Sequence, residues 1–231
     1  MVCDIYPISW IEQILEELEG KTLFTALDIW WRYHNICIRD EDQWKAAFKM
    51  PYGLFKPKVM FFGLMNSPPM FQRFMDQIFA PLKRWYLGMI FVYMDDILIA
   101  TGNDLVLHWE IVHAVLDLLH KESLFCKLSK CHFKRITITY LGIVVEEGMI
   151  CIDPTKVNGL LAWPWMLKTV KQVCSTLGVF GYHRVFIPGY ANIVRPLNNL
   201  LKKDATFRWK DEHTKAMDQL AYAVTTNPVL Q

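Results

Sequence analysis

The chain has 231 residues, of which 53% are hydrophobic, so it can form a substantial core and more than one structural lobe. Its 25 basic and 23 acidic residues nearly balance, so total charge alone gives no case for a polyanionic partner. Six cysteines without paired short spacings, and no secretory signal, favour reduced thiols in an intracellular protein, with a cytoplasmic particle and the nucleus not distinguished. The longest apolar run, residues 85–94, is too short to span a bilayer, so we expect no membrane partner.

The first twenty residues predict one amphipathic helix. Ser9 and Glu12 have the spacing of a capping box, and Gly20 suits the C-terminal cap. Apolar side chains between them recur at helical spacing, which predicts one buried face. These side chains are Trp10, Ile11, Ile14, Leu15 and Leu18.

Strands and turns are predicted next. Residues 22–28 form an apolar run that ends in an acid, and residues 33–38 alternate well enough for a second strand across a turn. Residues 39–62 are richer in charge, proline and glycine, which predicts short strands and turns that project from the main body.

The middle of the chain predicts a helix followed by two apolar strands. Asn66 or Ser67 can cap the helix, and Pro81 is expected to end it. The strands cover residues 87–94 and 97–101, with two adjacent acids between them.

The remaining elements change in character along the chain. A helix over about 104–122 precedes a hairpin formed by residues 136–145 and 149–152. After Asp153 only helices are predicted, one of them capped by Thr169. The chain stops at PVLQ without an obvious closing element, so we expect it to be cut from something longer.

Two adjacent carboxylates, Asp95 and Asp96, stand inside the apolar stretch FVYMDDILIA. Aspartate is common in tight turns, so an ordinary turn is the simpler interpretation. The apolar flanks would nevertheless place both acids at the edge of a core, where a divalent ion is a natural counter-charge. Asp28 ends a separate apolar strand, and three such acids could hold two cations roughly 3.5 to 4 Å apart. Spacing alone leaves both interpretations open.

Several stretches resemble one family. YMDD at 93–96 resembles the signature of reverse transcriptases, and the surrounding chain resembles the polymerases of gypsy-type LTR retrotransposons. LDIWWRYHNICIRDEDQWKAAF and YGLFKPKVMFFGLMNSPPMFQRFMDQIF resemble that family's first catalytic block and its fingers-to-palm block. YLGIVVEEGMICIDPTKV and LGVFGYHRVFIPGYANIVRPLNNLLKK resemble segments that follow the active site. The similarity covers essentially the whole chain in family order.

The resemblance implies an α+β fold: a right-hand polymerase palm with partial fingers, followed by a helical thumb and the start of an RNase H-like domain. The implied domains are a palm with truncated fingers at 1–152 (fingers about 39–67), a thumb at 153–205, and a connection with an incomplete RNase H-like domain at 206–231. The implied activity is that of an RNA-directed DNA polymerase, a nucleotidyltransferase. Its implied partners are an RNA or DNA template with primer, deoxynucleoside triphosphates and other segments of a Pol polyprotein. Its implied cofactor is a pair of Mg²⁺ ions, which Mn²⁺ can replace.

The resemblance also assigns residues. It makes Asp28, Asp95 and Asp96 the catalytic and metal-binding acids. The nucleotide-binding residues that it implies are Ile29, Trp30, Trp31, Arg32, Tyr33, Phe62, Gly63 and Gln72, with backbone amides of 29–33 facing the triphosphate. The ring of Tyr33 would exclude a ribose 2′-hydroxyl. The primer-binding residues that it implies are Tyr93, Met94, Leu141 and Gly142.

The chain departs from the family pattern at the nucleotide site. Trp31 and Arg32 stand where the family usually has Ser-Gly, so bulky side chains are expected beside the triphosphate. Phe61 replaces a proline, and only MVCDI precedes the YPI-like segment, where the family places basic fingers residues. These departures predict weakened nucleotide binding before any loss of the metal site.

Other interpretations stay open. The main alternative is a catalytically inactive, retrotransposon-derived remnant that at most binds nucleic acid, and a nucleotide cyclase ranks last because it has no reason to carry a helical thumb. Basic residues after 153 could contact phosphates or simply form a solvated face; they are Lys156, Lys168, Lys171 and Arg184. The cysteines and histidines at 113–132 are better explained by packing than by zinc, because no second ligand pair is evident.

Overall fold

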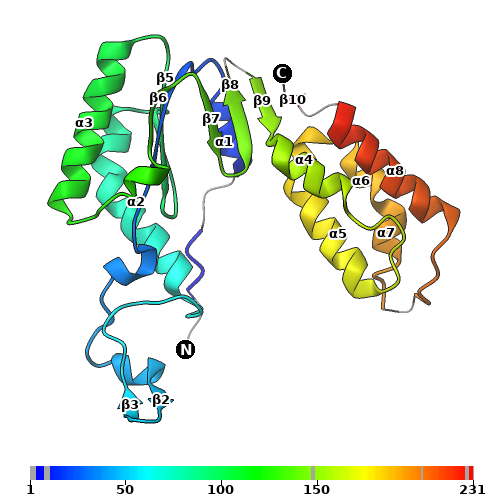
Figure 1. Ribbon diagram of the computed structural model, residues 1–231, viewed down its shortest axis with the longest axis horizontal. Helices are drawn as coiled ribbons and strands as arrows, with labels where there is room; N and C mark the ends of the chain where they lie inside the picture. Colours follow the sequence, from blue (N-terminus) through cyan, green and yellow to red (C-terminus); the bar gives the residue numbers. More distant parts are fainter. Residues whose placement is uncertain (1–3, 8–10, 147–148, 204, 227–228, 231) are drawn as a thin grey trace. The chain divides into compact units, whose positions relative to one another are not determined.

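A computed structural model of the chain describes residues 4–7, 11–146, 149–203, 205–226 and 229–230. The chain forms two compact units, residues 1–138 and residues 139–231 (Figure 1). None of the described helices combines the length and the apolar character that crossing a membrane requires.

Unit 1 is built around a four-stranded antiparallel sheet in the order β4-β5-β1-β6. The strands are β1 (Leu23–Asp28), β4 (Ile90–Tyr93), β5 (Asp96–Thr101) and β6 (His132–Arg135). β1 and β5 pair along their whole length and are almost entirely buried, because their residues are apolar at successive positions. The predicted strands at 22–28, 87–94 and 97–101 are thus confirmed, the second in shortened form.

Two long helices cover this sheet. Helix α2 (Ser67–Trp85) packs on β4, and α3 (Leu105–Lys121) packs on β5, side by side in Figure 1. The Asp104 carboxylate caps α3 by accepting a hydrogen bond from the Leu107 amide (3.0 Å). The core between helices and sheet includes Phe71, Met75, Phe79, Ile97, Ile99, Ile111, Val112 and Val115.

The end of α2 differs from the sequence prediction, and the predicted start of α1 lies outside the residues that the structure describes. Pro81 lies inside α2, so the prediction that it ends the helix is wrong. Proline removes only one backbone donor, and the packing of buried Phe79 before it and of half-buried Leu82 after it against the core outweighs that loss. Helix α1 (Ile11–Glu17) is followed by Gly20 at φ 73°, as predicted, whereas the predicted cap at Ser9 lies outside the described residues.

The segment after β1 does not form the strand predicted for residues 33–38. It forms a short 3₁₀ helix, η1 (Arg32–Asn35), and afterwards only an isolated bridge between Cys37 and Val59. Positive φ angles at Trp31 and Arg32 turn the chain away from an extended path, which side-chain alternation could not reveal.

The charged segment that follows does project from the unit as short strands and turns. It contains a second 3₁₀ helix, η2 (Gln43–Ala46), and the hairpin β2 (Phe48–Met50) with β3 (Gly53–Phe55). Both strands of the hairpin are exposed, and Figure 1 shows them at the far end of unit 1.

Unit 2 combines a small sheet with a group of helices. The sheet has the order β10-β9-β8-β7, with β7 (Thr137–Tyr140) beginning just before the unit boundary. The other strands are β8 (Ile143–Glu146), β9 (Met149–Ile152) and β10 (Val229–Leu230). The predicted pairing with residues 149–152 is present between β8 and β9, but the single strand predicted at 136–145 is wrong, because positive φ angles at Leu141 and Gly142 divide it into β7 and β8. Strands β8 and β9 belong to the same compact unit as the helices. The domain boundary predicted at 153 stays a prediction.

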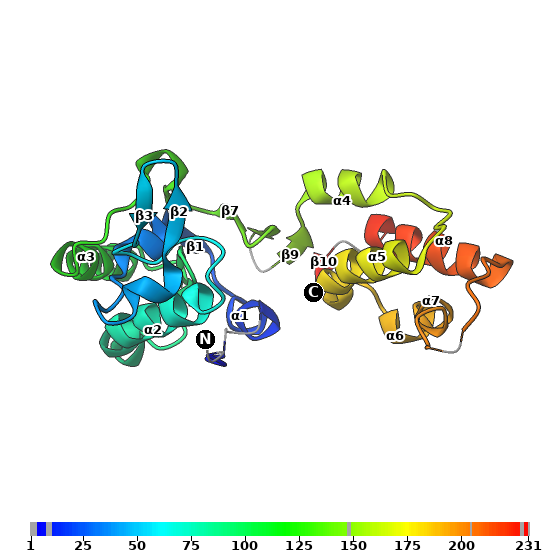
Figure 2. The ribbon, with the colours of Figure 1, turned by 90° about the horizontal axis from the view of Figure 1, so that it is seen from below.

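The helices of unit 2 pack around its last helix. They are α4 (Pro154–Leu161), α5 (Val170–Tyr182), η4 (Arg184–Phe186), α6 (Tyr190–Ile193), α7 (Arg195–Asn199) and α8 (Asp211–Thr226). Helix α8 contacts α4, α6 and α7. In Figure 2 it lies between α4 on one side and α6 and α7 on the other. The predicted cap at Thr169 is confirmed, since its side chain accepts a hydrogen bond from the Gln172 amide, and Asp153 caps α4 in the same way by accepting from the Thr155 amide.

Candidate active site

Three carboxylates from distant parts of the sequence meet at one end of the unit 1 sheet. Asp28 is the last residue of β1 and Asp96 the first of β5, and the two are direct partners in the antiparallel register. Asp95 lies in the tight turn between β4 and β5. One ligand oxygen from each acid lies within 4.8 Å of the others. The predicted convergence of these three acids is therefore present in the structure.

A buried glutamine holds the turn that carries Asp95. The Oε1 atom of Gln72 accepts a hydrogen bond from the Met94 amide (2.7 Å), and its Nε2 atom donates to the Val92 carbonyl (3.3 Å). Met94 needs this support because its φ of 57° lies in the left-handed region. Gln72 is fully buried, and through these bonds it positions the turn; the nucleotide-binding role predicted for it stays a prediction.

Backbone hydrogen bonds also hold the segments that carry Asp28 and Asp95. The Ile29 amide donates to the Asp95 carbonyl (2.9 Å), the Trp30 amide to Phe125 (2.7 Å) and the Lys127 amide to Asp28 (2.9 Å). The prediction that the amides of 29–33 all face a triphosphate is therefore wrong for Ile29 and Trp30, whose amides bond within the protein. The Ile29 side chain is also buried in the core.

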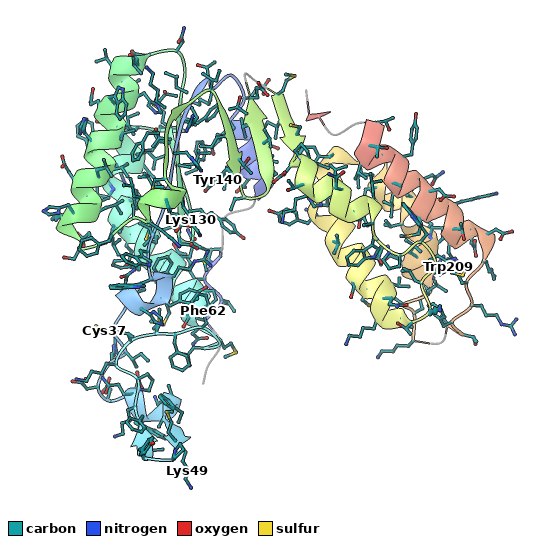
Figure 3. The ribbon with its side chains drawn as sticks, viewed as in Figure 1. Cys37, Lys49, Phe62, Lys130, Tyr140 and Trp209 are labelled. Carbon is teal, nitrogen blue, oxygen red and sulfur yellow. The ribbon has the colours of Figure 1, made fainter. Side chains whose placement is uncertain are left out.

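Two basic side chains pair with the acids. The Nε atom of Arg32 lies 2.5 Å from Oδ2 of Asp95, and the ammonium of Lys130 donates to Oδ2 of Asp28 at 2.8 Å. Lys130, labelled in Figure 3, ends the short 3₁₀ helix η3 (Leu128–Lys130) between α3 and β6. Sequence reasoning missed Lys130, because it lies 102 positions from Asp28 and no motif marks it.

Burial and mutual repulsion dominate the electrostatics of the centre. Burial raises the pKa of Asp95, although the Arg32 guanidinium opposes the change. Burial, together with the charges on Asp95 and Asp28, raises the pKa of Asp96 to about 6. The hydrogen bond to Asp28 raises the pKa of Lys130. Additional positive charge would therefore stabilise the ionised centre.

The donor set suits a hard divalent cation. Carboxylate oxygens are the ligands that Mg²⁺ and Mn²⁺ prefer. Within the described part of the chain, Oδ2 of Asp95 is buried and accepts no hydrogen bond of acceptable geometry, even though Arg32 lies close to it. An oxygen in this condition can serve as a metal ligand.

The structure brings some of the predicted nucleotide-binding residues together. Tyr33 is buried, and its ring packs edge-to-face against Phe62, with centroids 4.9 Å apart. Phe62 itself is exposed, and the following Gly63 has a φ of 97° that favours glycine. The exposed rings of Trp30 and Trp31 contact each other with centroids 4.8 Å apart.

The predicted primer-binding residues fall in both units. Tyr93 and Met94 belong to the turn beside the acids in unit 1, whereas Leu141 and Gly142 lie in unit 2 with φ angles of 50° and 74°. Leu141 and Gly142 line a cavity of about 400 Å³ whose other walls are Lys156, Val179, Tyr182 and His183. The Tyr182 hydroxyl donates to the Leu141 carbonyl at 2.6 Å, which holds this bend of the chain against α5.

Comparison with known proteins identifies the family. The family described as reverse transcriptase (RNA-dependent DNA polymerase) matches residues 2–145, which contain all three acids. The chain belongs to the reverse transcriptase family. This reverse transcriptase chain is also 34% identical over 228 residues to the transposon Tf2-3 polyprotein of Schizosaccharomyces pombe, and 33% identical to the Tf2-7 polyprotein. Each match covers 99% of this chain but only 17% of the polyprotein.

Solved structures agree in fold. A foamy viral protease-reverse transcriptase in complex with double-stranded DNA superposes with a TM-score of 0.83, at 22% identity, over 97% of this chain and 39% of that one. The same viral enzyme in complex with an RNA/DNA hybrid gives a TM-score of 0.82, at 22% identity, over 98% of this chain and 30% of that one. The α+β polymerase fold and the gypsy-type family predicted from the sequence are confirmed.

Proposed function

We propose that this reverse transcriptase chain is the RNA-directed DNA polymerase module of an intracellular retrotransposon polyprotein. The observation that carries the proposal is the meeting of Asp28, Asp95 and Asp96 within 4.8 Å at the end of a buried sheet, in a chain of this family. The chain spans 17% of the polyproteins that it matches, so further segments of such a polyprotein are its expected partners.

The three acids would hold two Mg²⁺ ions, with Mn²⁺ as a substitute. When bound, the ions neutralise charge on the reacting phosphate and lower the pKa of the attacking primer hydroxyl. Asp96 must be ionised to act as a ligand, so its pKa of about 6 makes metal binding improve as the pH rises through that value. Gln72 keeps Asp95 in place through the Met94 turn.

The substrates would be a deoxynucleoside triphosphate and an RNA or DNA template with its primer. The ring of Tyr33, which packs against Phe62 and Phe71, would exclude a ribose 2′-hydroxyl. The side chains of Trp30, Trp31 and Phe62 are exposed and available to a nucleotide. Leu141 and Gly142, with Lys156 beside them, would contact the primer backbone.

Primer extension tests this function. Wild-type protein is incubated with an RNA template, a DNA primer, deoxynucleotides and Mg²⁺ or Mn²⁺, beside Asp95→Asn. We expect extension by the wild type and a loss of about 10²-fold or more in the variant, because a group that stabilises transition-state charge is removed. Asp117→Asn is the matched control: this acid is exposed on α3 and does not belong to the carboxylate cluster, so extension should be unchanged.

One outcome would contradict the polymerase proposal. If the wild type binds Mn²⁺ at the three acids but extends no primer at any nucleotide concentration, the chain is a remnant that keeps the fold without the activity. Measuring Mn²⁺ binding and extension on the same preparation separates these cases, because ion binding and nucleotide binding can fail independently.

A further inference from the structure

Arg32 provides the counter-charge of the most buried acid. The side chain of Asp95 is only 6% exposed, whereas that of Arg32 is 41% exposed. A carboxylate at this depth needs a positive partner, because an unpaired buried charge is very costly. Oδ2 of Asp95, the oxygen beside Arg32, is also the oxygen with no well-formed hydrogen bond from the described residues.

The backbone holds Arg32 at this place under strain. Trp31 and Arg32 have φ angles of 64° and 38°, two consecutive left-handed conformations at residues other than glycine. Arg32 then starts η1, which is closed by hydrogen bonds from the His34 and Ile36 amides to Trp31 and Tyr33. Backbone hydrogen bonds therefore fix the conformation of the turn. This fixed turn keeps the guanidinium of Arg32 beside Asp95.

We propose that Arg32 is a tethered counter-ion of the carboxylate centre and competes with a divalent cation for Asp95. The inference rests on the metal site of the proposed function. A Mg²⁺-like ion lies about 2.0 to 2.1 Å from its ligand oxygens. Such an ion on Oδ2 of Asp95 and a guanidinium nitrogen 2.5 Å from the same oxygen exclude each other sterically and by charge.

The exchange needs only a side-chain movement. Arg32 is partly exposed, so its guanidinium can turn into solvent while η1 stays in place. Only molecules in which Arg32 has left Asp95 can bind the ion there. The apparent affinity for the ion is therefore the intrinsic affinity multiplied by the fraction of such molecules. Lys130 is a weaker competitor, because its partner Asp28 is less buried and the ammonium is more exposed.

A metal titration on the full chain tests the competition. Mn²⁺ binding is measured by electron paramagnetic resonance and calorimetry, without nucleotide or primer, for the wild type, Arg32→Gln, Arg32→Gly and Asp95→Asn. We expect both Arg32 variants to bind Mn²⁺ about tenfold more tightly than the wild type, as removal of one charge-assisted contact to a buried carboxylate implies. Arg32→Gly is included because glycine adopts the φ of 38° without strain, so this variant should fold even if Arg32→Gln does not.

Two controls define the measurement. Arg39→Gln removes the same unit of charge from an exposed side chain outside the centre, and its Mn²⁺ affinity should stay within about twofold of the wild type. Asp95→Asn should lose binding. As a second readout, Arg32→Gln should unfold at a lower temperature than the wild type in EDTA, and Mn²⁺ should raise its midpoint by more than it raises the wild-type midpoint.

The possible results are distinct. Equal or weaker Mn²⁺ binding by the Arg32 variants, with binding lost in Asp95→Asn, would overturn the competition and leave the metal site standing. Absence of Mn²⁺ binding in every protein would overturn both the competition and the metal site. Tighter Mn²⁺ binding by the Arg32 variants, together with a wild type that extends no primer in the separate extension experiment, would support the competition and overturn only the polymerase activity.

Discussion

At the scale of single residues, the turn after β1 is the most unusual part of the molecule. Two large side chains, Trp31 and Arg32, occupy left-handed backbone positions that glycine adopts at no cost. The same turn leads from Asp28 to Tyr33, so any change in it would displace groups on both sides of the carboxylate centre. Its conformation is held by interactions rather than by intrinsic preference.

Because of this strain, we expect glycine to stabilise the protein more than alanine at Trp31, the reverse of the usual order. At Trp31 we expect the glycine variant to be about 1 kcal/mol more stable than the alanine variant, because only alanine is penalised at a φ of 64°. Trp44, an exposed residue of η2 without positive φ, is the matched position, where alanine should be more stable by about 0.5 to 1 kcal/mol. Urea unfolding of the four variants measures both differences. Alanine variants that are more stable at both positions would show that the turn relaxes.

At the scale of elements, one buried histidine connects α3 to the sheet. His108 is fully buried, and its two ring nitrogens hydrogen-bond the hydroxyls of Thr25 on β1 and Thr101 on β5, each at 2.8 Å. Burial lowers the pKa of His108 below its ordinary value of 6.5. The connection is therefore made by a neutral imidazole in the middle of an apolar interface.

The lowered pKa of His108 predicts acid sensitivity. Because the unfolded chain binds the proton first, this residue's contribution to stability is complete above pH 6.5 and is lost as the pH falls towards the folded pKa. In that range the free energy of unfolding should fall by up to about 1.4 kcal/mol per pH unit from this group. His108→Gln should reduce the slope, measured by urea unfolding between pH 7.5 and 5 in EDTA.

The control for this prediction lies on the same helix. His120 is in the last turn of α3 and exposed, so His120→Gln removes a histidine from the same helix without disturbing the buried interface and is the matched variant. An identical slope in the wild type and His108→Gln would mean that other groups cause the acid sensitivity.

At the scale of the whole molecule, the chain consists of two units with separate cores. The core of unit 1 lies between the sheet and helices α2 and α3, and it supports all three acids. The core of unit 2 is formed by its helices, with Val173, Phe180, Leu197, Met217 and Leu220 completely buried. The candidate metal site therefore belongs to one unit alone.

Because the metal site belongs to unit 1, we expect metal binding to stabilise that unit and not unit 2. Mn²⁺ stabilises the folded state that binds it, so amide hydrogen exchange should slow in β1, β4 and β5, while α5 and α8 should keep their exchange rates. Mass spectrometry of peptides from each unit measures the change. Equal slowing in both units would show that they open as one cooperative body.

Local sequence signals determined a large part of this protein. Apolar runs predicted the strands on both sides of Asp95 and Asp96, the helical period predicted α3, and the cap at Thr169 predicted the start of α5. These signals work because a cap or an alternating pattern involves residues within one or two turns of each other. The YMDD motif and its flanking blocks pointed to the family for the same reason: the match needs only residues in order along the chain.

Only the tertiary structure decided which groups complete the site. The pairing of Lys130 with Asp28, the burial of Gln72 behind the Met94 turn and the contact of Arg32 with Asp95 all depend on packing between segments distant in sequence or on strained backbone. The failed strand at 33–38 and the continuation of α2 through Pro81 have related causes, since a strained turn and a buried helix face overrode local preference. Sequence by itself determined the acids and the elements that carry them; their charge balance was decided by the three-dimensional arrangement, because electrostatic energy depends on distance and burial rather than on order along the chain.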